Sequence, residues 1–157
     1  MELNKYIPGD LVMTNGVPLG TAKDVVYRVV SSDPSKTLEL DDGTILKGVV
    51  CLENIEGVGF GDKGYLFGDC FAWVNDIEPI PLTTEILEKN GWEIVSCRDG
   101  EEIYTRGGTC RFTRLININS FYLDGARYNT TGQWLIKYVH ELQHHLWVLG
   151  INNNMEV

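Results

Sequence analysis

The chain has 157 residues, of which 43% are hydrophobic and 22% are charged, and its net charge at neutral pH is −9. This composition is typical of a globular protein, and the lack of clustered lysine and arginine side chains argues against a nucleic-acid partner, whose phosphates need a basic face. No apolar run approaches the ~20 residues of a membrane span and the start shows no signal-peptide pattern, so we expect an acidic, cytoplasmic protein with no membrane contact.

The first 78 residues are predicted to form a small antiparallel β-barrel. Segments rich in β-branched and aromatic residues alternate with turn sequences such as Asn15-Gly16 and Asp41-Asp42-Gly43. The predicted strands span residues 10–14, 25–30, 37–40, 44–50 and 71–75. Short strands joined by tight turns over about 75 residues favour an SH3-like barrel.

A glycine-rich segment lies between the last two of these strands. Residues 59–64 match G-x-G-x-x-G, a pattern whose backbone can approach a pyrophosphate at the start of a helix. Because no helix pattern follows it, we predict a loop or turn here, and no nucleotide cofactor.

The second half, residues 79–157, is predicted to begin with a short helix and a β-meander. Two prolines within Glu78–Leu82 indicate an extended joint. Thr83 or Thr84 is then predicted to cap a short helix that runs through Glu88 and is ended by Asn90-Gly91. The predicted strands span residues 92–97, 101–106, 109–117, 119–123 and 126–128.

A C-terminal helix is predicted over residues 130–149. Thr130 suits the N-cap, Gln133 completes a capping-box pattern, and Gly150 suits the end of the helix. The apolar stripe that would cover the meander consists of Leu135, Tyr138, Val139, Leu142, Leu146 and Leu149. The predicted fold class is therefore α+β, an N-terminal SH3-like small β-barrel followed by an antiparallel β-meander packed against a C-terminal α-helix, with one continuous domain as the alternative to two.

The four cysteines, Cys51, Cys70, Cys97 and Cys110, are widely spaced and include no C-x-x-C pair. This spacing argues against a zinc ribbon and a redox motif. In a reducing cytoplasm we expect free, buried thiols.

The segment His140-Glu141-Leu142-Gln143-His144 matches H-E-x-x-H, the signature of zinc-dependent peptidases. In that motif two histidines one helical turn apart bind one Zn²⁺, and the glutamate takes a proton from the metal-bound water. The candidates are therefore His140 and His144 as zinc ligands and Glu141 as the general base.

Two features favour a chance match on a packed helix. In the predicted helix, His140 and His144 point away from the apolar stripe, toward solvent, and only His145 borders the stripe. A third ligand is also missing, because Glu156 is the sole candidate after the helix. We expect no catalytic residue, no metal and no cofactor, and we keep zinc with an upstream carboxylate ligand as the alternative.

Three segments, Pro8–Val12, Ile80–Trp92 and Tyr138–Trp147, resemble a group of small uncharacterised proteins of gut Bacteroidetes and their phages or prophages. The similarity is close over residues 76–92 and 134–150. The resemblance implies a bacterial cytoplasmic or phage-encoded accessory protein. The group has no assigned activity, so the resemblance implies no catalytic residues.

The favoured function is that of a non-enzymatic accessory or interaction protein with an unknown protein partner. One alternative is a minimal zinc-dependent hydrolase or peptidase that uses residues 140–144. The other is a homo-oligomerising structural protein whose subunits meet through Ile136 and Trp147 on the outer face of the C-terminal helix.

Overall fold

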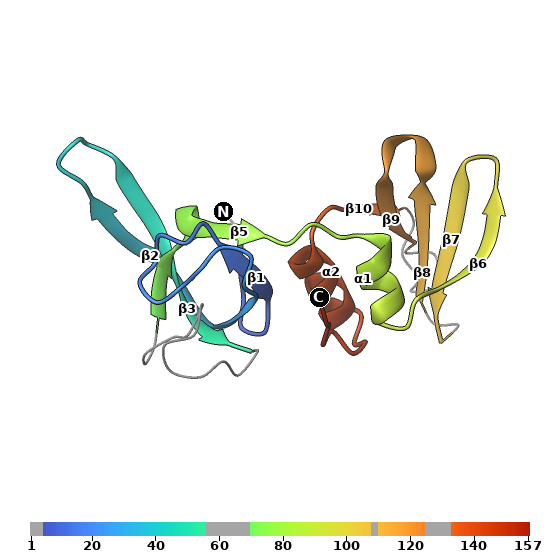
Figure 1. Ribbon diagram of the computed structural model, residues 1–157, viewed down its shortest axis with the longest axis horizontal. Coiled ribbons are helices and arrows are strands. Elements are labelled where there is room, and N and C mark those ends of the chain that lie inside the picture. Colours follow the sequence, from blue (N-terminus) through green and yellow to red (C-terminus); the bar gives the residue numbers. More distant parts are fainter. Residues whose placement is uncertain (1–4, 56–69, 108–109, 125–132) are drawn as a thin grey trace. The chain divides into compact units, whose positions relative to one another are not determined.

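The computed structural model describes residues 5–55, 70–107, 110–124 and 133–157. The chain forms two compact units, Met1–Ile80 and Pro81–Val157, and each contains one antiparallel sheet of five strands (Figure 1). The prediction of mostly antiparallel strands with a C-terminal helix, an α+β protein, is confirmed. Among the described residues, no helix is long and apolar enough to cross a lipid bilayer.

The sheet of unit 1 has the strand order β4-β3-β2-β1-β5. Its elements are β1 (Leu11–Thr14), β2 (Tyr27–Glu39), β3 (Ile45–Asn54), β4 (Cys70–Trp73), the 3₁₀ helix η1 (Val74–Asp76) and β5 (Ile77–Pro79). Strand β1 pairs with both β2 and β5, and its buried Val12 packs with Tyr27 and Val50 in the core of the unit. The predicted barrel is not confirmed, because β4 and β5 remain the edges and the described strands do not close.

The two predicted strands at residues 25–30 and 37–40 are one long strand, β2. Its register with β3 shifts between Val29 and Ser31 and again between Asp33 and Thr37. Irregularities of this kind let a strand bend without ending, so the two predicted strands remain one. Beyond the second shift, residues 37–47 form a hairpin whose strands pair only with each other, and Figure 1 shows it projecting from the sheet. We call residues 37–47 the hairpin arm.

The sheet of unit 2 is a meander with the order β10-β9-β8-β7-β6. Its elements are α1 (Thr84–Lys89), β6 (Glu93–Arg98), β7 (Glu101–Arg106), β8 (Cys110–Leu115), the 3₁₀ helix η2 (Ile116–Ile118), β9 (Ser120–Asp124), β10 (Gln133–Ile136) and α2 (Val139–Val148). The predicted cap of α1 is confirmed, because Thr83 Oγ1 accepts a hydrogen bond from the Ile86 backbone at 3.3 Å. The predicted glycine loop at 59–64 and strand at 126–128 lie outside the described residues.

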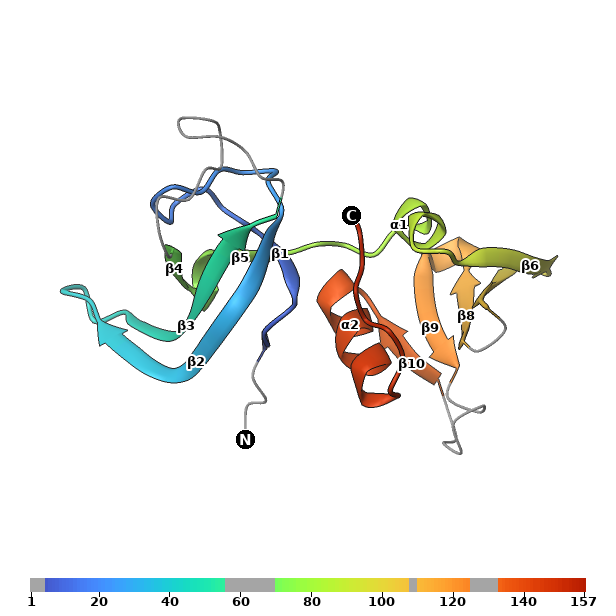
Figure 2. The same cartoon turned by 90° about the horizontal axis from the view of Figure 1, so that it is seen from below.

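The core of unit 2 lies between one face of this sheet and the helices (Figure 2). The sheet contributes Tyr104, Phe112 and Leu123, all buried, from neighbouring strands. The buried Trp92 packs edge-on against Phe112, with ring centroids 4.8 Å apart. From α2, Leu142 is among the fully buried residues, so the sequence-based expectation that this helix covers the meander is confirmed in outline.

The predicted helix of residues 130–149 is wrong in its first half. Residues Gln133–Ile136 form strand β10, which pairs with β9 in continuous register, and α2 begins only after Tyr138. A short apolar run such as Trp134–Ile136 suits a helix or a strand equally well by its composition. The free edge of β9 decides between them, because β10 satisfies that edge's backbone hydrogen bonds. Thr130, the predicted N-cap, lies outside the described residues.

Candidate functional site

The H-E-x-x-H segment begins at the very start of α2, and its glutamate caps the helix. Glu141 is the third residue of α2, and its Oε2 accepts hydrogen bonds from the backbone N–H groups of Lys137 at 2.7 Å and Tyr138 at 3.2 Å. Backbone N–H groups at a helix start have no partner within the helix, and a carboxylate there also interacts favourably with the helix dipole. This structural task engages one of the two carboxylate oxygens of the residue that would act as the general base.

The orientation predicted for His140 is wrong. Only 4% of this residue is exposed, and its ring stacks on Tyr138 with centroids 5.9 Å apart. The buried residues of α2 are Val139, His140, Leu142, Gln143 and Leu146, so the buried side extends onto the face that was assigned to solvent. Among the other predicted stripe residues, Leu135 is exposed and does not belong to the helix.

The C-terminal tail is hydrogen-bonded to side chains of α2 and of the C-cap of α1. The Gln143 side-chain amide donates to the carbonyl of Asn153 at 3.3 Å, which ties the tail to α2 one turn after His140. The Asn90 side chain holds the backbone of Glu156 with two hydrogen bonds, of 2.7 and 2.8 Å. The tail thus folds back along the helices, a contact that the sequence does not indicate.

The two histidines of the motif are neighbours. His140 and His144 have ring centroids 5.6 Å apart, which fits a shared zinc, since two imidazoles bound at about 2.1 Å place their centroids roughly 5–6 Å apart. His144 itself is half-buried. The predicted ligand pair therefore comes together in space, and the orientation argument against a metal no longer holds.

The pair has no third ligand in the part of the chain that the structure describes, where no group of three His, Cys, Asp or Glu side chains is placed to hold a metal ion. Glu156, the downstream candidate, is exposed and its backbone is bound by Asn90. The remaining histidine, His145, packs near Trp134 and its Nδ1 lies 2.8 Å from the Glu141 carbonyl oxygen. The described residues therefore do not assemble a catalytic zinc site with three protein ligands and an open position.

The predicted oligomer surface on the outer helix face is only partly present. Trp147 is 63% exposed, whereas Ile136 is 1% exposed and belongs to β10, where it faces the core. The prediction for Ile136 is therefore wrong, because the strand turns this side chain inward.

A polar cluster on the inner side of the second sheet has shifted pKa values. Glu102 Oε2 accepts hydrogen bonds from Arg114 Nη1 at 2.8 Å and from the Tyr104 hydroxyl at 3.0 Å. The bond from Arg114 lowers the pKa of the Glu102 carboxyl, and burial raises the pKa of Tyr104 to about 12. With the Arg114 Nε bound to Asn119 Oδ1 at 3.0 Å, the cluster is internally satisfied and has a structural role.

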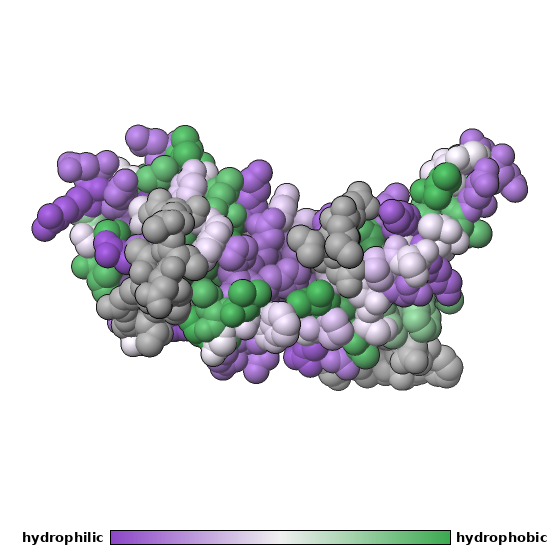
Figure 3. Space-filling model, turned by 180° about the vertical axis from the view of Figure 1, so that it is seen from behind, coloured by the Kyte–Doolittle hydropathy of each residue, from purple (hydrophilic) through white to green (hydrophobic). Residues whose placement is uncertain are grey.

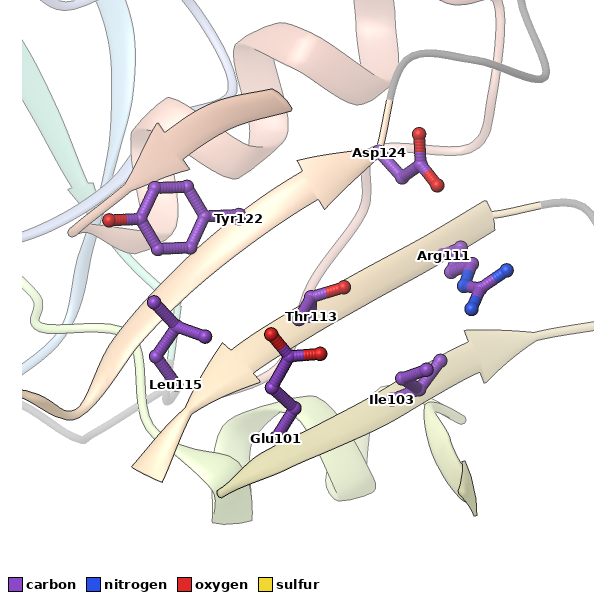
Figure 4. Close-up of a pocket in the computed structure, with 7 residues that line it drawn as sticks. All are labelled: Glu101, Ile103, Arg111, Thr113, Leu115, Tyr122 and Asp124. Atoms are coloured by element: carbon purple, nitrogen blue, oxygen red, sulfur yellow. The ribbon is translucent and has the colours of Figure 1, made fainter. Parts of the chain in front are cut away.

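The opposite face of the second sheet carries a shallow hollow of about 360 Å³ (Figure 4). Its lining residues, which project from β7, β8 and β9, are Glu101, Ile103, Arg111, Thr113, Leu115, Tyr122 and Asp124. This set contains no histidine or cysteine, so it offers none of the usual nucleophile–base pairs. The hollow is open and mixed in charge, and it is not assigned a reaction.

The structure describes the exposure of the cysteines at positions 51, 70 and 97. Cys51 and Cys70 are buried, as predicted, whereas Cys97 is exposed on β6. Burial raises the pKa of the Cys70 thiol, which keeps it protonated and a weak nucleophile.

The hairpin arm is a surface that the sequence did not single out. Leu38, Leu40 and Ile45 are 46%, 40% and 63% exposed, and apolar side chains are visible on the arm in Figure 3. The turn at residues 41–43 was predicted correctly, but the projection of the hairpin beyond its neighbours depends on where β1 and β4 end.

Comparison of the chain with models of protein families, with curated proteins and with solved structures found no match.

Proposed function

We propose that the chain is a non-enzymatic interaction protein whose contact surface is the hairpin arm. The observation that carries this proposal is the exposure of Leu38, Leu40 and Ile45 on a projecting hairpin. The resemblance of the chain to small proteins of Bacteroidetes and their phages further suggests an accessory role in a phage or mobile element. The capping role of Glu141 supports a non-enzymatic function, because it gives the motif's glutamate a structural purpose.

The arm has the properties of a docking element. An isolated two-stranded hairpin is marginally stable in water, and exposed apolar side chains gathered on one element mark protein interaction sites. The Leu38–Leu46 pair lies directly across the two strands, so a partner that covers it would also stabilise the hairpin. The partner expected from this chemistry is a protein with an apolar groove.

The first experiment is recovery of a partner by the full chain from a lysate of phage-infected host cells, followed by calorimetric titration with the purified partner. Leu38→Lys should weaken binding by about tenfold or more, because Leu38 belongs to the Leu38–Leu46 pair that the partner would cover and loss of an apolar anchor commonly costs over 1 kcal/mol. Leu19→Lys is the matched control, since Leu19 is exposed in the same unit but outside the arm. Equal affinities of wild type and Leu38→Lys would refute the arm as the contact surface.

A minimal zinc hydrolase is the second candidate, and the 5.6 Å separation of the His140 and His144 rings is what favours it. Elemental mass spectrometry of tag-free protein would decide whether zinc is bound. One zinc per chain that is lost in His140→Ala/His144→Ala, together with peptide hydrolysis lost in Glu141→Gln, would establish this function in place of the first. Absence of both leaves the pair as packed histidines.

For unit 1 we further propose an SH3-like small barrel. The strand order, in which the fifth strand returns to pair with the first, and the 3₁₀ helix directly before that strand support this assignment. An experimental structure in which the two edges of the sheet, β4 and β5, meet across the core would agree with it. Two widely separated edges would contradict it.

A further inference from the structure

Strand β6 is an open edge of the second sheet. Among the described strands it pairs with β7 alone, and Figure 1 shows it at the outer margin of that sheet. All of its residues except Ser96 are exposed, including Ile94 at 47% and Val95 at 59%. An exposed edge of this kind presents unpaired backbone donors and acceptors to another strand.

The β6–β7 register contains one irregularity, and it changes which β6 side chains share a face. The register passes from Ile94 directly to Ser96, so Val95 is an extra residue. The six residues of β6 therefore fill five pairing positions, in which Ile94 and Val95 occupy one position together. Alternation then places Glu93, Ser96 and Arg98 on one face of the sheet, and Ile94 and Cys97 on the other.

This arrangement is complementary to itself. In an antiparallel pair of two β6 strands centred on Ser96, Glu93 of each copy lies opposite Arg98 of the other copy, on the same face. The Ile94–Val95 position lies opposite Cys97, again on one face, and Ser96 lies opposite its own equivalent. Each facing pair therefore joins an acid with a base or an apolar residue with a thiol, and a two-fold axis produces every such pair twice.

We propose that the chain forms a two-fold dimer through antiparallel pairing of β6 with β6 of a second copy, which joins two five-stranded sheets into one. The charge complementarity of Glu93 and Arg98 selects a second copy as the occupant of this edge and sets the register. A bulge often protects an edge strand from pairing. Here the bulge at Val95 keeps the side chains that lie opposite each other on the same face of the sheet. This inference is independent of the function proposed for the hairpin arm.

Charge reversal tests the dimer directly. Wild type should show a mass that rises from 17.7 kDa toward twice that value with concentration in sedimentation equilibrium. Glu93→Arg alone and Arg98→Glu alone each place like charges opposite each other twice, and each should raise the dissociation constant about tenfold. An equimolar mixture of these two variants should recover the dimer, because both facing pairs are then of opposite charge.

Two further variants complete the test. Glu78→Arg reverses a charge on β5, an edge strand of the other sheet, and should leave the dissociation constant unchanged. Ser96→Cys in a Cys97→Ser background should form a covalent dimer with oxidised glutathione, since equivalent residues at the axis lie within disulfide reach, whereas Cys97→Ser alone should not.

The proposal is overturned by any of four results. The first is a wild-type chain that stays monomeric at every concentration up to its solubility limit, and the second is a mixture of the two reversed variants that does not recover the dimer. The third is an effect of Glu78→Arg as large as that of Glu93→Arg, and the fourth is a dimer that Ser96→Cys fails to cross-link. A Leu38→Lys variant should dimerise like wild type, which separates this surface from the hairpin arm.

Discussion

Replacement of Glu141 by alanine separates a helix cap from a catalytic base. The Glu141 carboxylate accepts two backbone hydrogen bonds at the start of α2, of 2.7 and 3.2 Å. Loss of a capping side chain costs about 1 kcal/mol, within a range of roughly 0.5–2, and loss of a negative charge at a helix N-terminus costs about 0.3–1 kcal/mol more. We therefore expect Glu141→Ala to lower the free energy of unfolding of unit 2 by about 1–2 kcal/mol.

Amide hydrogen exchange, read by mass spectrometry on peptides from residues 139–148, measures this effect locally. A loss of 1–2 kcal/mol corresponds to roughly 5- to 30-fold faster exchange of the protected amides. Glu141→Gln should give a smaller acceleration, because the amide oxygen still accepts hydrogen bonds but the charge is gone. Exchange in unit 1 peptides should not change, since α2 belongs to unit 2.

The control is Glu88→Ala, which removes an exposed carboxylate from the other helix of the same unit. Glu88 is near the end of α1 rather than at its start, so its removal should change stability by less than about 0.5 kcal/mol. Unchanged exchange of α2 in Glu141→Ala would refute the capping role, and it would favour the catalytic role if the same variant lost a peptide hydrolysis that wild type shows.

Three further results are expected. Leu142→Asp places an unpaired carboxylate in the fully buried core of unit 2 and should cost several kcal/mol, measured by urea unfolding. Folding lowers the pKa of Glu102 from its ordinary value of 4.5. The ionised carboxylate therefore stabilises the fold at neutral pH, and this contribution is lost as the pH falls through the folded pKa. The stability difference between wild type and Glu102→Gln should shrink over that acidic range. Gly48→Ala should destabilise unit 1 by about 1–2 kcal/mol or more in thermal unfolding, because Gly48 has a φ of +82° and its new methyl would meet Val74 Cγ2 at 3.0 Å.

Two of these changes have matched controls. Val148→Asp introduces the same charge on the exposed side of α2 and should cost about 1 kcal/mol or less, mainly because a negative charge at the end of a helix opposes the helix dipole. Equal losses in Val148→Asp and Leu142→Asp would mean that the buried face of α2 is misassigned. Gly43→Ala has nearly the same φ as Gly48→Ala, +83°, but its methyl meets nothing within 4 Å. It should therefore cost less than Gly48→Ala, and the reverse order would contradict the contact with Val74.

Local signals in the sequence were enough to place most strands and the first helix. The Asp99-Gly100 turn lies between the segments 92–97 and 101–106 that were predicted as strands, with φ of +47° and +83°, because a two-residue hairpin turn needs residues that tolerate positive φ. Thr83 caps α1 for an equally local reason, since its hydroxyl reaches a backbone N–H three residues on. The match to H-E-x-x-H was also visible from the residues alone, and so was the adjacency of His140 and His144 on one helix.

Long-range contacts decided what the local pattern left open. Residues 133–136 became a strand because the edge of β9 was available to pair with them. The C-terminal tail returns to the helices, where Gln143 and Asn90 hold it, and His140 is buried although the helical pattern assigned it to solvent. The length of the hairpin arm and the open edge of β6 likewise depend on where neighbouring strands end. Burial and edge exposure are properties of the assembled chain, and short-range periodicity carries no information about which distant segment will cover a given face.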